Sequence, residues 1–450
     1  MVALQVEGQV FARGDEGYEE ARQGSVWHAR VPERYPDLIV HAVGEADVIA
    51  AVRHAAAASL RIGVRSGGHS WSANHLRDGG MLLDVSRLDA VEIDAASMTA
   101  TAGPGRSGHE LCEMLEERGL FFPSGHCRGV GLGGYLLQGG YGWNSRAVGL
   151  ACESVLGVDV VTADGELRHA NAEQDSELYW SARGAGPGFF GVVTRFHLRL
   201  RPMPAVCGAS MYIYPTEVLD EFFTWVWSIG RDVSRKVEMQ VLLSKAFPNV
   251  GVEQPAMALG SPVFAESEEA AQDAVAIFES CPVREQAILA APYLPMTLSA
   301  WYDLVMQSFP SPEMRFGTDN MWTAAAIEEV LPGLRQIVET MPPHPTHVLF
   351  LNWGDRPERP DMANCVEAPF YLALYGQWPD ERDDERYGGW ASEQVRSMEH
   401  LSAGIQLADE NLGERWDRFA TDEAMQRLDR ARAHYDPHGF FHQYMGRPDS

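Results

Sequence analysis

The stretch Arg65-Ser66-Gly67-Gly68-His69-Ser70 follows a short apolar segment and places two adjacent glycines between a cation and a histidine. Because Gly67 and Gly68 carry no Cβ atom, successive backbone N–H groups can approach a pyrophosphate closely there. A plain turn is the alternative interpretation, but it leaves the histidine and a second glycine-rich segment unexplained. The stretch therefore favours a loop that lines an extended, anionic cofactor.

Further glycine-rich segments follow along the chain. Residues 124–134 have the sequence SGHCRGVGLGG, and residues 138–142 have the sequence QGGYG. The G-x-G-x-x-G spacing occurs at positions 129–134 and again at 186–191, but with 43 glycines in 450 residues it also arises by chance. A dinucleotide-binding βαβ unit needs a strand directly before this motif and a helix directly after it. Pro123 and Ser124 precede the first motif and more glycines follow it, so a Rossmann-type nicotinamide site is disfavoured.

The sequences of residues 65–70, 124–134 and 138–142 together resemble the berberine bridge enzyme-like flavoproteins, which belong to the vanillyl-alcohol oxidase and p-cresol methylhydroxylase superfamily. The resemblance is close over the N-terminal 200 residues and returns at residues 436–441, whose sequence is DPHGFF. The middle of the chain is similar only in outline. The resemblance implies an FAD-linked oxidoreductase, and within that class an oxidase.

The expected fold class is α+β. The resemblance implies a two-lobed FAD-binding domain of the vanillyl-alcohol oxidase type, and the later sequence pattern predicts a substrate domain with a mainly antiparallel sheet covered by helices. Pro202 and Pro204 mark a boundary near residue 205. The expected domains are residues 1–205 for FAD binding, 206–410 for the substrate, and a C-terminal segment, 411–450, that returns to the FAD domain. Periodicity predicts helices at 45–59, 108–118, 218–229, 267–278 and 422–434, and strands at 61–64, 81–85, 90–93, 98–102, 155–162, 192–200, 237–243, 257–264, 348–352 and 370–377.

Two residues are expected to hold the cofactor covalently. The resemblance implies that FAD is bonded through its 8-alpha methyl group to His69 and through carbon 6 to Cys127, a bicovalent attachment. Both positions lie on the dimethylbenzene edge of the ring, so the other end stays free for a substrate. Because a thiolate is the reactive form of cysteine, His126 and Arg128 are expected to lower the pKa of Cys127. The alternatives are a turn or core histidine at position 69 and an inert thiol at position 127, since relatives exist with the histidine link alone.

The resemblance extends the expected FAD contacts to other parts of the chain. Residues 184–194 depart from the glycine tract that relatives carry, but contacts from Gly191 and Val192 to the adenine end stay expected. His442 and Gln443 correspond to polar residues near the flavin pyrimidine edge, with capping of the chain end as the alternative. Val130 matches a position where a small residue admits dioxygen. The complete expected set, besides the two attachment residues, is Arg65, Ser66, Gly67, Gly68, Ser70, Val130, Gly131, Gly133, Gly134, Gly139, Gly140, Tyr141, Gly142, Val155, Gly191, Val192, His442 and Gln443.

The catalytic base is not where the resemblance would put it. Flavin oxidases take a hydride from a substrate C–H bond while a protein base removes a proton from an adjacent O–H or N–H group. The family's glutamate and tyrosine positions correspond to Leu374 and Leu407, which are aliphatic. Tyr375 and Tyr444 are the candidates that remain, because a phenol in a cationic environment can ionise. Each could instead be a wall of the pocket or part of the core.

The composition of the chain argues against several classes of binding partner. The formal net charge of −27 argues against nucleic acid as a partner, because phosphate binding depends on clustered Lys and Arg. Neither a secretory signal nor an apolar run of membrane-spanning length is found, so we expect a cytoplasmic protein without a membrane partner. The 6 cysteines are widely spread, and His109-Glu110 lacks the second histidine of a zinc motif, so no metal is expected.

The favoured function is an oxidase that acts on a small alcohol, phenol, amine or sugar-like molecule and reduces dioxygen to hydrogen peroxide. Three alternatives stay open: a flavin dehydrogenase with another electron acceptor, a flavin-binding protein with little catalysis, and a nicotinamide-dependent reductase. The second lobe is rich in aromatic residues, some of which are candidates for an apolar ring-binding pocket: Trp301, Tyr302, Trp322, Trp353, Tyr371 and Trp378.

Overall fold

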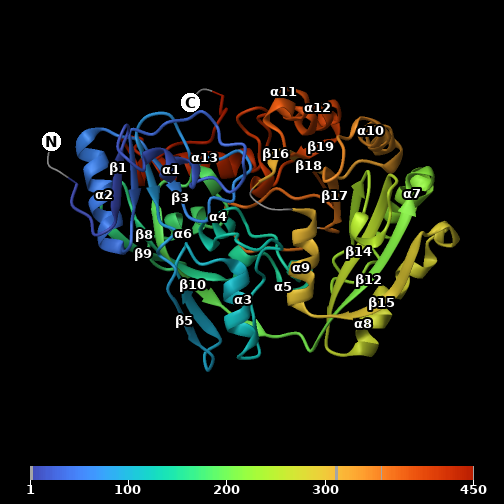
Figure 1. The fold of residues 1–450 in the computed structure, drawn as a ribbon. Coiled ribbons are helices and arrows are strands. Elements are labelled where there is room, and N and C mark those ends of the chain that lie inside the picture. Colours follow the sequence, from blue (N-terminus) through green and yellow to red (C-terminus); the bar gives the residue numbers. More distant parts are fainter. Residues whose placement is uncertain (1–3, 310–312, 356, 449–450) are drawn as a thin grey trace.

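A computed structural model describes residues 4–309, 313–355 and 357–448 of the protein. The chain forms two lobes that lie side by side, the first from the N-terminal part of the sequence and the second from its middle (Figure 1). In the first lobe, a four-stranded sheet has the order β1-β2-β4-β3 and a five-stranded sheet has the order β5-β6-β10-β8-β9. The bounds of these strands are β1 Gln9–Ala12, β2 Leu38–His41, β3 Ile62–Arg65, β4 Met81–Asp84, β5 Val91–Asp94, β6 Thr99–Ala102, β8 Val155–Val161, β9 Leu167–Asn171 and β10 Val192–Arg199.

Helix α2, Glu45–Ala58, joins β2 to β3 and packs against both sheets of the first lobe. Its apolar residues Val48, Ala51, Val52 and Ala55 are fully buried, as the helical spacing predicts. The parallel pairs β2–β4 and β3–β4 require a crossover of this kind. The other elements of this lobe are α1 Tyr18–Gln23, α3 Gly108–Glu116, β7 Leu120–Phe121, α4 Leu132–Leu137, α5 Ser145–Val148, α6 Ser176–Ser181 and β11 Arg201–Pro202.

The second lobe is built on one eight-stranded sheet with the order β15-β12-β14-β13-β17-β18-β16-β19, which lies within residues 206–404. Its neighbouring strands pair in antiparallel fashion. The strands are β12 Val206–Pro215, β13 Gln240–Ser244, β14 Ala256–Ala265, β15 Leu289–Met296, β16 Arg315–Thr323, β17 His347–Asn352, β18 Phe370–Trp378 and β19 Ser402–Gly404. The helices are α7 Leu219–Ile229, α8 Glu268–Val275, α9 Leu298–Ser308, α10 Ile327–Thr340, α11 Asp384–Tyr387 and α12 Trp390–Ser397.

The two faces of this sheet are buried against different partners. Strand β18 is buried along its whole length, and its residues alternate between the faces. Leu372 and Leu374 belong to the apolar core that also contains residues of α7, α8, α10 and α12. Tyr371 and Tyr375 belong to a different cluster, which includes residues of the first lobe such as Leu150. The sheet therefore turns its second face towards the first lobe.

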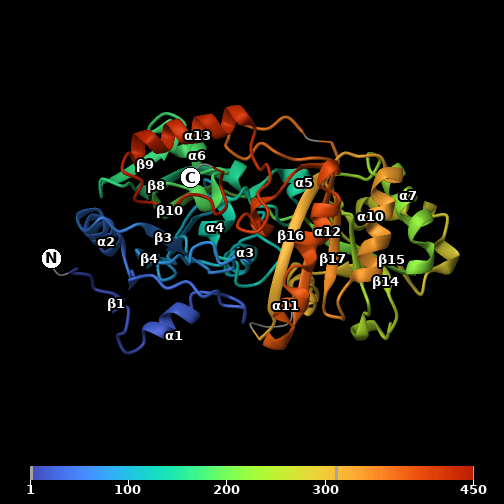
Figure 2. The ribbon, with the colours of Figure 1, turned by 90° about the horizontal axis from the view of Figure 1, so that it is seen from above.

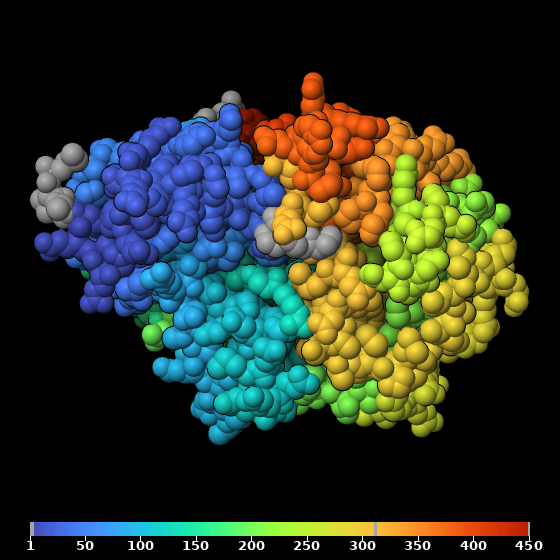
Figure 3. Space-filling view, viewed as in Figure 1, coloured from blue at the N-terminus to red at the C-terminus, as the bar shows by residue number. Residues whose placement is uncertain are grey.

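The C-terminal segment returns to the first lobe. Helix α13, Asp422–Tyr435, contacts α6 and is seen in red beside the blue and green elements (Figure 2). Beyond it, Phe441 forms a parallel bridge with Ile62. In the space-filling view, the N-terminal residues fill one side of the molecule and the middle of the chain fills the other (Figure 3).

The predicted α+β class is confirmed. The helices expected near 45, 108, 218, 267 and 422 are all present, but strands β12, β15 and β16 and helices α9 and α10 were not predicted. Two prolines interrupt β15, and β16 carries Asp319 and Asn320 in its interior, so neither shows the apolar alternation of a strand. Within the described residues, no helix combines the length and apolarity needed to cross a bilayer.

Candidate active site

A cavity of about 450 Å³ lies between the two lobes. The first lobe contributes the loop after β3, the segment around Cys127 and the residues that lead into α4. The second lobe contributes strands β12, β13, β14, β17 and β18 together with helix α9. Described second-lobe residues lining the cavity between positions 211 and 375 include no Asp, Glu, Lys or Arg. One end of the cavity is therefore a loop-built cradle, and the other is a largely apolar pocket.

The two glycine-rich loops of the cradle interlock, backbone against backbone. A Cβ atom added to Gly67 would lie 2.6 Å from the backbone nitrogen of Gly131, and one added to Gly131 would lie 2.8 Å from that of Gly67. A Cβ atom on Gly133 would lie 2.7 Å from the hydroxyl oxygen of Ser66. Since real Cβ atoms do not approach other atoms this closely, the glycines are needed for the two loops to meet. Gly134, in contrast, has open space where its Cβ atom would be.

Most of the expected cofactor residues line this cavity. Arg65, at its edge, donates to Asp84 with an Nη1–Oδ2 distance of 2.8 Å, which fixes the start of the loop. The expected residues that line the cavity are Arg65, Ser66, Gly67, Gly68, His69, Ser70, Cys127, Val130, Gly131, Gly133, Gly134, Tyr141, Gly191 and His442, together with the candidate base Tyr375.

Other expected residues do not line the cavity. Gly139 and Gly140 have positive φ angles of 100° and 78°, and added Cβ atoms would collide with Asn364 and Ala151 respectively. A Cβ atom on Gly142 would lie 2.2 Å from the carbonyl oxygen of Ser124. These glycines shape the turn behind α4. Four more expected residues lie outside the lining. Val155 and Val192 are buried at the starts of β8 and β10. The backbone carbonyl of Gln443 accepts a hydrogen bond from Arg77, and the fourth residue is Tyr444.

The imidazole of His69 is buried in an aromatic setting. Its ring centroid lies 4.1 Å from that of Trp27 and 5.9 Å from that of Trp71. Burial lowers the pKa of His69 to about 3, so the ring is neutral at physiological pH. Its Nε2 atom has no hydrogen-bond partner within the described part of the chain. His69 lines the cavity, and its imidazole is a neutral ring with one unpaired nitrogen.

The environment of Cys127 differs from the one expected. His126 lies 3.0 Å from Glu238, and Arg128 pairs with Asp303 at 2.6 Å, so both flanking side chains are engaged by carboxylates of the second lobe. Burial, together with the carboxylate of Asp409, raises the pKa of Cys127 to about 12. The expectation that His126 and Arg128 lower this pKa was therefore wrong. The pairing partners could not be read from the sequence, because both come from the other lobe.

Asp409 is the residue at this site that the sequence did not reveal. Its Oδ1 atom accepts from Trp71 at 2.7 Å, and its Oδ2 atom accepts from the hydroxyls of Tyr371 at 2.5 Å and Tyr375 at 3.0 Å. All four residues line the cavity. Burial is the largest effect on Asp409 and raises its pKa, while the three donors oppose that shift. The result is a buried carboxyl group that can exchange a proton with Tyr375.

The charged neighbour of Tyr375 is a carboxylate and not the cation that was expected. Burial and Asp409 both raise the pKa of Tyr375 well above its ordinary value, so the phenol keeps its proton. Tyr444 lies outside the cavity lining, and its hydroxyl donates to the carbonyl of Ala185 at 2.7 Å. Burial raises the pKa of Tyr444 as well, despite the nearby Arg432. The argument from a cationic environment was therefore wrong for both phenols.

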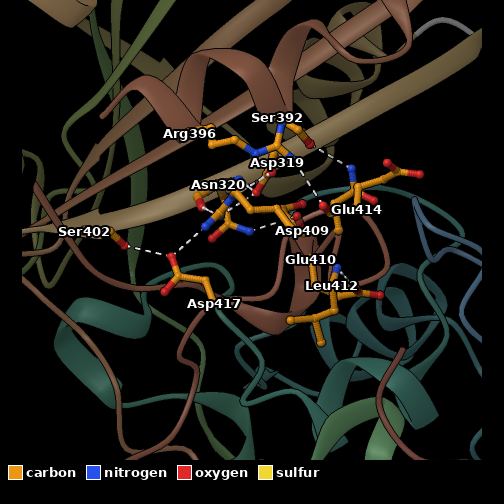
Figure 4. A network of polar contacts seen from close by, with 12 residues as sticks. Asp319, Asn320, Ser392, Arg396, Ser402, Asp409, Glu410, Leu412, Glu414 and Asp417 are labelled. Atoms are coloured by element: carbon orange, nitrogen blue, oxygen red, sulfur yellow. Dashed lines mark hydrogen bonds and ion pairs between the residues drawn. The ribbon is translucent and has the colours of Figure 1, made fainter. Parts of the chain in front are cut away.

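A polar network holds the segment that carries Asp409 (Figure 4). The side-chain amide of Asn320, on β16, donates to the carbonyls of Gln406 at 3.1 Å and Asp409 at 2.8 Å. Asn320 also accepts from the backbone N–H of Gln406 at 2.8 Å. Arg415 makes two hydrogen bonds to Asp319 and one to the carbonyl of Asn320. This network fixes Asp409 relative to the sheet.

Two histidines of the second lobe, His344 and His347, line the cavity, and burial lowers the pKa of both. Burial lowers the pKa of His347 to about 4. Its Nδ1 atom lies 3.0 Å from the amide nitrogen of Gln377, which donates to it, and its ring centroid lies 5.0 Å from that of Tyr375. His347 was not predicted, and its place in the cavity depends on the register of β17 and β18.

The donor set of the cradle fits an FAD. The interlocked glycine loops leave backbone groups close to the cavity, and Gly134 leaves open space there. His69 Nε2 and Arg65 Nε are buried without a hydrogen-bond partner among the described residues, as a missing ligand would leave them. The apolar pocket begins beside Tyr375, where the free end of a tethered ring system would need to meet a substrate.

Comparisons with known proteins agree with this geometry. The FAD binding domain family matches residues 36–171. The "FAD-linked oxidoreductase nodO" of Hypoxylon pulicicidum is 32% identical over 426 residues, which are 93% of this chain and 93% of that protein.

Solved structures show the same fold. The crystal structure of 6-hydroxy-D-nicotine oxidase from Arthrobacter nicotinovorans has a TM-score of 0.85 at 22% identity and covers 100% of this chain and 99% of that one. Wild-type Phl p 4.0202, described as a glucose dehydrogenase, has a TM-score of 0.80 at 17% identity, with 97% and 96% of the two chains covered. With the glycine-loop cradle and its histidine in place, the chain belongs to the FAD-linked oxidoreductases.

Proposed function

We propose that this protein is an oxidase whose FAD is bonded to both His69 and Cys127 and whose second lobe receives a small, neutral, ring-bearing alcohol, phenol or amine. The observation that carries the proposal is that one cavity is lined by both attachment residues and by the Tyr375–Asp409 pair. Two tethers on one edge of the ring would leave its other end open towards the second lobe. The apolar pocket of the second lobe begins at that end.

The bound flavin supplies a two-electron acceptor for a hydride from the substrate. The hydroxyl of Tyr375 lies in the cavity and donates to Asp409, so it can take a proton from the substrate O–H or N–H group while passing its own proton to the carboxylate. Trp71 and Tyr371 hold the carboxylate for this transfer. In this assignment Tyr375 touches the substrate and Asp409 is the final proton acceptor. Tyr444 has no part in it, because its hydroxyl is bonded to Ala185.

Val130 supports dioxygen as the electron acceptor. It lines the cavity and is half-buried, at the position where the family resemblance places a residue that controls oxygen access. Among the related structures, wild-type Phl p 4.0202 is described as a glucose dehydrogenase, and a variant of Phl p 4 with valine in place of isoleucine is described as a glucose oxidase. A valine here agrees with oxidase activity and peroxide formation.

The pocket supports a neutral and mostly apolar substrate. Its second-lobe walls are mostly aliphatic and aromatic, with Leu242, Leu349 and Phe309 among them, and they also carry uncharged polar side chains. Burial lowers the pKa of His347 to about 4, so this histidine adds no charge. A charged substrate would lose its hydration in this pocket without gaining an opposite charge. Gln240, Ser244 and Gln307 offer polar partners for the hydroxyl or amine groups of a neutral substrate. We also propose that the protein does not bind nucleic acid, because its net charge of −27 would repel phosphates. A cytoplasmic location stays a further proposal.

The test is the absorbance of purified protein before and after acid precipitation, with denaturing gels viewed for flavin fluorescence. Wild type should keep its yellow colour in the pellet. His69→Ala and Cys127→Ala should each keep covalently bound flavin through the remaining link, and the double variant should release it. Colour lost in either single variant would refute double attachment.

A substrate screen coupled to peroxide detection tests the reaction. Neutral aromatic alcohols and amines should bleach the flavin under anaerobic conditions and give hydrogen peroxide under air. Bleaching without peroxide would indicate a dehydrogenase with another electron acceptor. Bleaching by a nicotinamide cofactor would point to a reductase, and the absence of bleaching by any compound would point to a flavin-binding protein.

A further inference from the structure

Three side chains with metal-ligating atoms meet on one face of the five-stranded sheet, away from the cavity. Asp159 lies on β8, His169 on β9 and His197 on β10. The register pairs Asp159 directly with His169, and it pairs His197 with Gly157, two residues before Asp159. Because side chains alternate between the faces of a strand, all three point to the same side. None of them lines the cavity between the lobes.

The three ligand atoms lie close enough to share one ion. Asp159 Oδ1 is 2.5 Å from His169 Nδ1 and 3.1 Å from His197 Nε2. All three atoms lie within 4.8 Å of one another. The two imidazole rings are nearly perpendicular, at 88°, with centroids 4.9 Å apart. Tetrahedral ligands at about 2.0–2.1 Å from a zinc ion lie about 3.3–3.4 Å apart. The separation of Asp159 from His197 is close to this value, and the exposed His169 ring would withdraw slightly to admit the ion.

The sheet holds the cluster in place before any ion binds. Gly157 lies opposite His197, and a Cβ atom added to it would be 3.8 Å from His197 Cδ2, so the histidine ring lies over the glycine. This lets the ring lean across β8 towards Asp159. The carboxylate is half-buried, and His169 is open to solvent on its outer side, with half of its side chain exposed. Water can therefore complete the coordination.

We propose that Asp159, His169 and His197 form a binding site for one divalent zinc-like ion. Two imidazole nitrogens and one carboxylate oxygen are a donor set that suits Zn²⁺ and is poorly suited to Mg²⁺, which prefers oxygen ligands. A fourth ligand comes from solvent. The ion would tie together three neighbouring strands of the FAD-binding lobe, so its role is structural and it stands apart from the redox reaction. The site was not predicted from the sequence, because 10 and 38 residues separate Asp159 from the two histidines.

One nearby charge opposes the ion. Arg195, which pairs with Asp159 across the strands, has its Nε atom 4.0 Å from Asp159 Oδ2. Its positive charge repels a cation and competes for the carboxylate. The site should therefore be moderate in affinity, and removal of this charge should strengthen it.

Isothermal titration of the flavin-loaded protein, after removal of metals with a chelator, tests the site. Zn²⁺ should bind with one equivalent at this site and raise the melting temperature, whereas Mg²⁺ should do neither. His169→Ala and His197→Ala should each weaken Zn²⁺ binding at least about tenfold, while the exposed His400→Ala is the matched control and should bind as wild type. Arg195→Gln should bind Zn²⁺ severalfold more tightly.

The flavin spectrum shows whether a variant that loses Zn²⁺ binding is still correctly folded. Both histidine variants should keep wild-type flavin absorbance and circular dichroism, so a loss of Zn²⁺ binding in them reports on the site itself. The proposal is overturned if wild type takes up no Zn²⁺. It is also overturned if the His169→Ala, His197→Ala double variant takes up Zn²⁺ with wild-type affinity and stoichiometry.

Discussion

The carboxyl group of Asp409 is buried and yet accepts hydrogen bonds from Trp71, Tyr371 and Tyr375. A buried carboxylate without donors would be costly, so the three donors make its charged form accessible. The effect of burial is larger than that of the three hydrogen bonds, so the pKa of Asp409 is raised. Such a group can bind and release a proton at a pH where an exposed aspartate stays ionised.

We predict that Asp409→Asn slows flavin reduction about a hundredfold or more while leaving the flavin content unchanged, because a positioned base typically contributes that much. Tyr375→Phe should slow it as well, since the relay to Asp409 is cut. Anaerobic stopped-flow spectroscopy with a substrate from the peroxide screen measures the rate. Full turnover in both variants would remove the proton-transfer role.

The pH profile of the same rate follows from the direction of the pKa shift. Only the ionised form of Asp409 accepts a proton, so the rate should rise with pH through its raised pKa, above the ordinary aspartate value of about 3.9. The Asp409→Asn profile should lack this rise. Tyr444→Phe is the control, because its hydroxyl faces Ala185 and its profile should match that of wild type.

At the scale of elements, the two glycine-rich loops act as one unit. We predict that Gly67→Ala destabilises the protein by about 1–3 kcal/mol, the usual cost of overpacking, because its Cβ atom would lie 2.6 Å from the nitrogen of Gly131. The flavin content should fall together with the stability, because the added methyl group forces the two glycine-rich loops apart. Chemical denaturation and the ratio of flavin to protein absorbance measure both effects.

Gly44→Ala is the matched control for that prediction. Gly44 has an extended backbone before α2 and open space where a Cβ atom would lie. The control should keep wild-type flavin content and lose less than about 1 kcal/mol of stability, because Ala is a poorer N-cap residue than Gly. If Gly67→Ala behaved like Gly44→Ala, the close approach of the two loops would not matter to the cradle.

Strand β18 shows where local patterns stop being informative. Its aromatic and aliphatic residues predict a strand, and the strand is present at Phe370–Trp378. Because both faces are buried, the sequence does not say which residues face the first lobe. The tertiary structure places Leu374 in the helix-covered core and Tyr375 in the cavity. An aliphatic residue at position 374 is therefore what its surroundings require.

At the scale of the whole molecule, several buried histidines make stability depend on pH. Burial lowers the pKa of His28 to about 4, that of His75 to about 3 and that of His347 to about 4. In the unfolded chain these groups titrate near about 6.5. Below that pH the unfolded chain binds protons that the folded chain does not, so stability falls as the pH decreases from about 6.5.

We predict a lower free energy of unfolding at pH 5.5 than at pH 7, by up to about 1.4 kcal/mol for each such histidine per pH unit below 6.5. Most carboxyls titrate below this range, so they contribute little to the difference. Urea denaturation at both pH values measures the difference. It should persist in high salt, which screens surface charge. Equal or greater stability at pH 5.5 would contradict the prediction.

The sequence by itself determined the features that depend on local backbone chemistry. Adjacent glycines beside His69 indicated the cofactor loop, helical periodicity located α2 and α13, and the motifs around Cys127 indicated the family, which the comparisons confirm. The domain limits at 205 and 410 stay predictions. These features could be predicted because a glycine's freedom and a helix's period are set within a few residues.

Only the tertiary structure decided what the side chains meet. Asp409 reaches Tyr375 across 34 residues, Glu238 and Asp303 engage the side chains on either side of Cys127, and Asp159 meets two histidines from neighbouring strands. Each of these contacts depends on strand register or on the docking of one lobe against the other. Neither is encoded in any short stretch of chain, because both follow from how the whole apolar surface is buried.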